Sequence, residues 1–98
     1  MKEYIIPGSK IKSIVDFLNL SKEIFGYPLG KDGNLDDFKA FANANLEVPS
    51  IIIWNDASDS HRSLGYDYDR IISSIPYGIE RSKDGGKLIG NGIVLFLS

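Results

Sequence analysis

Continuous apolar runs alternate along the chain with segments in which apolar residues recur at helical spacing. The runs Tyr4–Ile6, Ser50–Trp54 and Ile93–Leu97 each predict a β-strand. The second and third runs do not alternate with polar residues, which is typical of strands covered on both faces. We therefore expect three strands inside a layered fold.

Helical spacing marks two segments in the first half of the chain. Ser13, with Asp16 three residues later, forms a capping-box pattern, and Gly26 marks the end of the helix that follows. Asn34 is a good N-cap for a second helix, which fades near residues 43–45. The apolar stripes are Ile14, Phe17, Leu20 and Ile24 in the first helix, and Leu35, Phe38 and Phe41 in the second.

A third helix is predicted over Tyr68–Ile75, and Pro76 ends or kinks it. Residues 55–65 are polar and predict a loop with at most a helical turn, and residues 79–82 predict a further turn. The order of strands and helices predicts a small α/β domain with a mainly parallel three-stranded sheet, one domain over residues 1–98. A hairpin pairing Lys87–Ile89 with the last strand through Asn91-Gly92 remains an alternative.

Charge is distributed unevenly along the chain, although the net charge is only −2. Residues 32–69 hold eight acids and two bases, a net of −6, and the remainder has a net of +4. An acidic middle favours a basic partner and fast, salt-sensitive association. Solvated charges on loops and helix ends explain the same pattern, so both interpretations stay open.

Catalytic and cofactor chemistry is poorly represented. The chain has no cysteine, and His61 is its only histidine. The glycines of residues 26–33 lack the ending of a phosphate-binding loop, and no basic stripe suited to nucleic acid is present. We expect no enzyme activity, cofactor, metal or nucleic-acid partner. The first apolar run is too short for a signal peptide, and no segment is long enough to span a membrane, so we expect a cytoplasmic protein.

Several segments resemble the barstar family of small intracellular inhibitors of a secreted bacterial ribonuclease. The similar segments are Ile6–Gly8, Ile11–Asp16, the loop around Pro28, Gly33–Asp36, Pro49, Ile53–Trp54 and Leu95–Ser98. This resemblance implies a three-stranded parallel sheet packed with helices. It also implies that the second helix and the preceding loop fill the active site of a basic ribonuclease, where carboxylates replace substrate phosphates.

Carried over residue by residue, the resemblance matches Asn34 and Leu35 to the start of the helix and Asp36 to a contacting acid. The chain departs from the family at other positions. Gly30 and Lys31 stand where the family has an aromatic pair before the helix, and Asp32 stands where it has the adjacent glycine. Lys39 replaces a helix tryptophan, and Ala40 replaces the most influential acid of the family. The expected toxin contacts are Asp36, Asp32, Asp37, Asn34, Asn43, Ala40, Tyr27, Lys31, Gly30, Lys39 and Tyr77.

The resulting hypothesis is an immunity protein that forms a 1:1 complex with a cognate nuclease toxin, with Asp32 and Asp37 supplying acidity lost at Ala40. One alternative is a module of the same fold that binds a basic partner without inhibiting an enzyme. Another is a small enzyme or ligand-binding domain with a pocket near Asp59, His61 and Tyr66.

Overall fold

The computed structural model describes residues 2–76 and 92–98. Its elements are β1 (Lys2–Pro7), the 3₁₀ turn η1 (Gly8–Lys10), α1 (Ile14–Phe25), the 3₁₀ turn η2 (Gly30–Asp32), α2 (Leu35–Asn45), β2 (Ser50–Asn55), α3 (Ala57–Leu64), α4 (Tyr66–Ser74) and β3 (Ile93–Leu97). In this part of the chain they form a small α/β domain with four α-helices. The three strands are parallel and lie in the order β1-β2-β3, which confirms the predicted strands and their direction.

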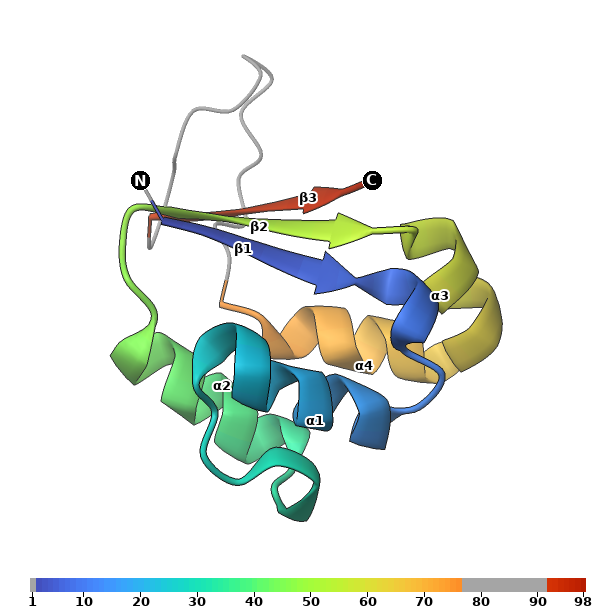
Figure 1. The fold of residues 1–98 in the computed structure, drawn as a ribbon, viewed down its shortest axis with the longest axis horizontal. Helices are drawn as coiled ribbons and strands as arrows, with labels where there is room; N and C mark the ends of the chain where they lie inside the picture. Colours follow the sequence, from blue (N-terminus) through green and yellow to red (C-terminus); the bar gives the residue numbers. More distant parts are fainter. Residues whose placement is uncertain (1, 77–91) are drawn as a thin grey trace.

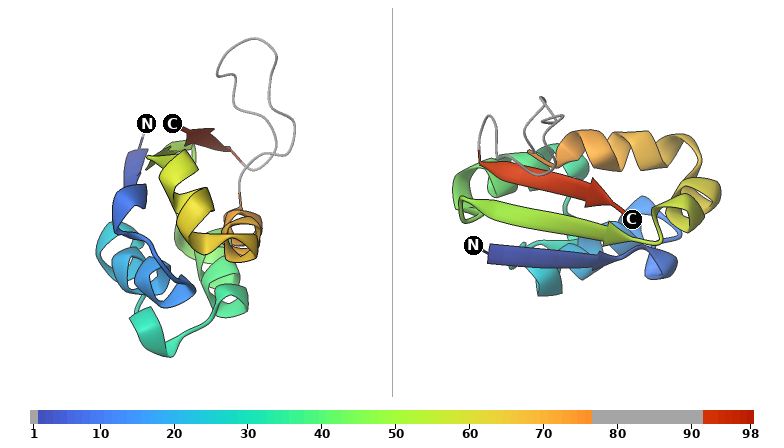
Figure 2. Two further views of the ribbon diagram at one scale, coloured as in Figure 1. Left: turned by 90° about the vertical axis from the view of Figure 1, so that its right-hand side faces the viewer. Right: turned by 90° about the horizontal axis from the view of Figure 1, so that it is seen from above.

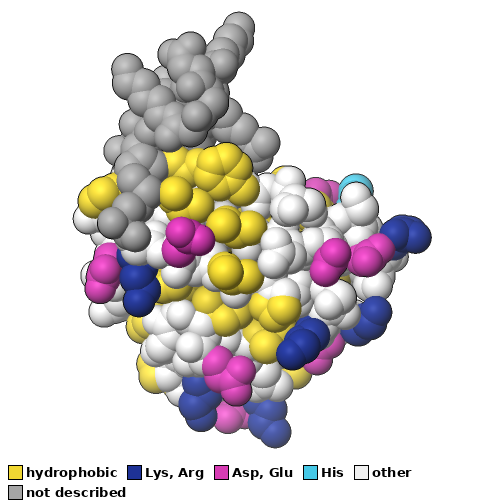
Figure 3. All heavy atoms as spheres, turned by 45° about the horizontal axis from the view of Figure 1, so that its top comes forward, with side chains coloured by type: hydrophobic (Ala, Val, Ile, Leu, Met, Phe, Trp, Pro, Cys, Tyr) yellow, Lys and Arg dark blue, Asp and Glu magenta, His cyan; other side chains and the backbone are white. Residues whose placement is uncertain are grey.

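Helices α1, α2 and α4 lie on one side of the sheet (Figures 1 and 2). Tyr4, Ile52 and Leu95 are aligned across the three strands, and all three are buried toward these helices. On the opposite face Ile5, Ile53 and Phe96 are aligned, and Ile5 and Phe96 are 52% and 44% exposed. The cover on both faces predicted for the second and third strands is therefore incomplete: Ile53 of β2 is half-buried on this face, and Phe96 of β3 is exposed. Hydrophobic side chains gather on the surface on this side of the molecule (Figure 3).

Aromatic rings fill the space between the sheet and the helices. Phe17 of α1 stacks on Trp54 of β2 with ring centroids 5.9 Å apart, and meets Phe38 of α2 edge-on at 5.1 Å. All three rings are at most 1% exposed. Of the apolar stripes predicted for the first two helices, only Phe17 and Phe38 are buried, and the other five residues are partly buried against the core. Leu18 and Phe25 of α1, outside the predicted stripe, are also buried. This packing determines which face of α2 remains in contact with solvent.

Residues 57–64 form α3, so the loop predicted for residues 55–65 is wrong over most of its length. The buried positions of this helix, Ala57, Ser60 and Leu64, have helical spacing. Two of them are small, and one of those is polar, so the apolar stripe is too weak to recognise in the sequence. Helix α4 runs over Tyr66–Ser74 and ends just before Pro76, as predicted to within two residues. The turn at 79–82 and the hairpin strand at 87–89 lie outside the described residues.

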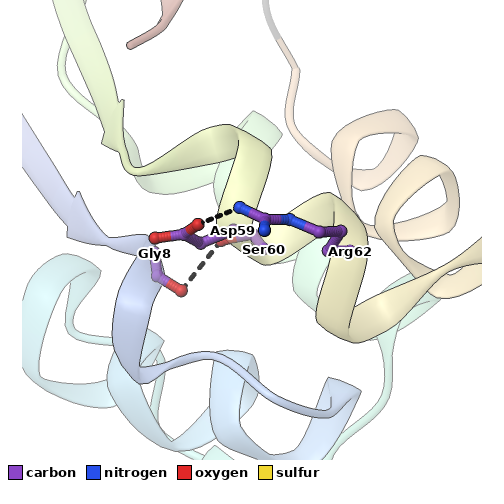
Figure 4. A network of polar contacts seen from close by, with 4 residues as sticks. All are labelled: Gly8, Asp59, Ser60 and Arg62. Atoms are coloured by element: carbon purple, nitrogen blue, oxygen red, sulfur yellow. Dashed lines mark hydrogen bonds and ion pairs between the residues drawn. The ribbon is translucent and has the colours of Figure 1, made fainter.

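A buried hydrogen-bond chain joins η1, directly after β1, to α3 and β2, and Figure 4 shows its link between Ser60 and Gly8. Trp54 Nε1 donates to Ser60 Oγ at 2.9 Å, and Ser60 Oγ donates to the carbonyl oxygen of Gly8 at 2.8 Å. Ser60 has no exposed surface. Because a buried hydroxyl is costly unless it is paired, this chain explains why a serine is tolerated in the core. It also fixes α3 at the edge where β1 and β2 end (Figure 1).

Candidate binding surface on α2

The start of α2 is formed by the predicted cap. Asn34 has an extended backbone, and its side-chain oxygen accepts a hydrogen bond from the amide of Asp37 at 2.8 Å. Its carbonyl oxygen accepts the first helical bond, from the amide of Phe38 at 2.9 Å. This geometry satisfies an otherwise unpaired amide at the helix start, so the helix needs neither neighbouring carboxylate as a cap.

The buried and exposed faces of α2 follow its helical period. Phe38 and Ala42 are buried against the core. On the other side Asp36, Ala40 and Asn43, at spacings of four and three residues, are all exposed. Lys39 is exposed as well, and so are Lys31, Asp32 and Asn34 in the preceding segment. Asp37 is exposed too. We call these eight exposed residues the α2 surface: Lys31, Asp32, Asn34, Asp36, Asp37, Lys39, Ala40 and Asn43.

Two adjacent carboxylates of this surface have different environments. Asp37 Oδ2 accepts a hydrogen bond of 2.7 Å from the hydroxyl of Tyr27, so Asp37 joins the helix to the preceding loop. Asp36 has no such partner in the described part of the chain. Side chains one residue apart on a helix point about 100° apart, which explains the difference. Asp37 therefore stabilises the fold, whereas Asp36 is available to another molecule.

Tyr27 lies in the core, so the expectation that it contacts a partner directly is wrong. The side chain has no exposed surface, and its ring meets those of Phe38 and Phe41 at 5.5 Å in each case. The loop approaches the ring very closely: a Cβ added to Gly33 would lie 1.9 Å from the Tyr27 hydroxyl. Tyr27 thus supports the α2 surface from beneath.

Gly30 is a second correction, because it is buried rather than available for contact. It has a φ of +54°, a left-handed conformation that glycine adopts without penalty, and it begins the turn η2. The amide of Lys31 donates to the side chain of Asn19 at 3.2 Å, which ties this turn to α1. Tyr77, also expected at the surface, lies outside the described residues.

The carboxylates of the α2 surface have no ion-pair partner within residues 2–76 and 92–98. The ion pairs of that part are Asp59 with Arg62 on α3 and Asp67 with Arg70 on α4. Three acids on the α2 surface accompany two lysines, Lys31 and Lys39. Unpaired exposed carboxylates are well suited to meet cations on a partner.

The sequence did not identify a hollow that adjoins this surface between α2 and α4. Leu35, Tyr66 and Asp69 are among the residues that line it. Tyr66 is 80% exposed, and tyrosine is enriched among the residues that dominate binding energies. The sequence alone does not predict that Tyr66 is exposed, because Tyr68, a tyrosine only two residues later, is buried.

Within residues 2–76 and 92–98, the alternative pocket near Asp59, His61 and Tyr66 is not formed as one hollow. The three residues line three separate hollows, and the imidazole of His61 stacks on Tyr68 with centroids 4.7 Å apart. Among the described residues, no group of three or more potential ligands could hold a metal ion. Nor does any helix in those ranges have the length and apolar character needed to cross a membrane.

The contact between Tyr27 and Asp37 predicts an alkaline loss of stability. Burial, and then the hydrogen bond to the Asp37 carboxylate, raise the pKa of the Tyr27 phenol above its ordinary value of about 10. The folded protein therefore retains this proton more tightly than the unfolded chain. The resulting stability is complete below about pH 10 and is lost as the pH rises through the raised pKa.

Urea unfolding at a series of alkaline pH values tests this prediction. The free energy of unfolding should fall more steeply with pH in the unmodified protein than in Tyr27→Phe, which has no phenolic proton to lose. Equal slopes in the two proteins would show that Tyr27 titrates as an ordinary exposed tyrosine.

We compared the chain with protein-family models and with curated proteins, and no family model and no curated protein matches it.

Proposed function

We propose that this protein is a barstar-like immunity protein, which binds a cognate bacterial nuclease toxin one to one and blocks its active site. The observation that supports the proposal most directly is that the carboxylate of Asp36 is not used by the fold. This carboxylate is exposed and without an ion-pair partner among the residues described, on a helix that is already capped by Asn34. A carboxylate that the fold does not use is the kind of group that an intermolecular contact requires.

The chemistry of a nuclease active site suits such a surface. Nucleases that act on a phosphate backbone present Arg, Lys or His side chains to it, and carboxylates form charge-assisted hydrogen bonds with the same groups. A helix held by the contact of Tyr27 with Asp37 presents Asp36 and Asn43 with little conformational freedom to lose. Such preorganisation lowers the entropic cost of association. By its resemblance to the barstar family, we propose a ribonuclease as the target and the cytoplasm as the place of action.

Titration calorimetry against a candidate bacterial ribonuclease toxin domain, at two salt concentrations, tests the proposal. A nuclease assay should be run on the same samples. One-to-one binding that weakens with salt and abolishes cleavage is the expected result. Binding that leaves cleavage intact would instead indicate an interaction module, and an absence of binding would contradict the proposed target.

A further inference from the structure

A second hollow lies away from the α2 surface, between α3 and the segment that follows β1. It has a volume of about 390 Å³ and is lined by Ser9, Lys12, Asp59, Arg62 and Ser63. The turn η1 follows β1 and α3 closely follows β2, so the hollow adjoins the edge where these parallel strands end.

Buried contacts hold the backbone on both sides of this hollow. Ser9 follows Gly8, whose carbonyl oxygen accepts the hydrogen bond from Ser60, and Asp59 precedes Ser60 in α3 (Figure 4). Ser60 in turn accepts a bond from Trp54 in the core. The backbone of the two walls is therefore held from inside the molecule, and the side chains that line the hollow are exposed to solvent.

The lining combines two cations, one carboxylate and two hydroxyl groups, a net charge of +1 in a chain of net charge −2. Asp59 Oδ1 accepts a hydrogen bond from Arg62 Nη2. A guanidinium has five N–H donors, and the Arg62 side chain is 78% exposed, so this contact leaves other donors for a ligand. The ammonium of Lys12 has no ion-pair partner in the part of the chain that the structure describes.

We propose that this hollow binds the phosphate group of a small phosphate monoester. Arg62 and Lys12 supply the positive charge, and the hydroxyls of Ser9 and Ser63 supply neutral donors. A monoester carries close to two negative charges at neutral pH, whereas each phosphate of a nucleic acid backbone carries one. The net charge of −2 on the chain disfavours a long polyanion, and the lining offers two cations for the two charges of a small monoester. This proposal does not depend on the proposed function.

The test is a titration of ¹⁵N-labelled protein with inorganic phosphate and with glycerol 3-phosphate, at neutral pH and constant ionic strength. Saturable shifts confined to the amides around Ser9, Lys12, Arg62 and Ser63 are expected. Tighter binding of glycerol 3-phosphate would show that the ligand's alcohol portion contributes, and equal binding would identify the phosphate alone as the recognised group. Shifts that do not saturate at tens of millimolar, or that are equal at other exposed lysines, would overturn the proposal.

Four variants sharpen this titration. Lys12→Ala and Arg62→Ala are each expected to weaken phosphate binding by about threefold to fivefold, the size of an exposed charge interaction. Asp59→Asn is expected to tighten it by about twofold to fivefold, because the competing negative charge is removed. Arg70→Ala removes a guanidinium from a matched pair with Asp67 on α4, and should change nothing.

Two results would contradict the assignment of the ligand. Weaker binding in Asp59→Asn would show that the carboxylate does not compete with the anion. A short RNA that binds more tightly per phosphate than glycerol 3-phosphate, at the same amides, would identify a contact with a nucleic acid backbone.

Discussion

Replacing Asp36 with alanine is expected to weaken binding of the cognate nuclease by about 2–5 kcal/mol, the range typical when one partner of a buried, hydrogen-bonded charge pair at an interface is truncated. The free energy of unfolding should change little. Asp36 is exposed, and the N-cap contact belongs to Asn34. Loss of a carboxylate from the first turn of an exposed helix costs only about 0.3–1 kcal/mol.

Calorimetry and urea unfolding, applied to the same variants, separate these two effects. Asp37→Ala should show a loss of stability, because it removes the oxygen that accepts the hydrogen bond from Tyr27. Glu3→Gln is the matched control for net charge. Glu3 is exposed and alternates with buried Tyr4, so it lies on the sheet face opposite α2. A variant Asp36→Ala that unfolds readily but binds normally would assign Asp36 to helix stabilisation alone.

The parts of the fold that sequence patterns predicted are those controlled by local spacing. The strand runs, the capping box at Ser13 and the cap at Asn34 each depend on residues within a few positions of one another. Helix α3 was missed because its buried face contains Ser60, whose bond to Gly8 spans 52 residues. A polar residue satisfied by a distant carbonyl group has no local signature.

The candidate surface also has features that local spacing predicts and features that depend on distant contacts. Exposure of Asp36, Ala40 and Asn43 follows from the helical period once Phe38 is assigned to the core. The burial of Tyr27 does not follow from the helical period, because it depends on the close approach of Gly33 and on a carboxylate ten residues away. Tyrosine carries both an apolar ring and a polar hydroxyl, so it suits an interface and a core edge equally well. Only the tertiary contacts distinguish the two roles.

Gly8→Ala is expected to destabilise the protein by about 3 kcal/mol or more, through overpacking together with loss of buried hydrogen bonds. A Cβ at this position would lie 2.1 Å from the carbonyl oxygen of Asn55, and 2.5 and 2.6 Å from Ser60 Oγ and Trp54 Nε1. These atoms cannot all move away without breaking the chain of hydrogen bonds that joins β1, β2 and α3. Urea unfolding measures the loss directly.

Gly26→Ala is the matched control for this substitution. Gly26 has a φ of +77°, and a Cβ there would meet no atom within 4 Å. The change therefore adds left-handed strain without a clash, at a cost of about 1–2 kcal/mol. A Gly8→Ala variant no less stable than Gly26→Ala would show that the edge of the sheet can relax around a methyl group. The same relaxation would move the backbone of Ser9 and Asp59, which follow and precede the hydrogen-bonded Gly8 and Ser60.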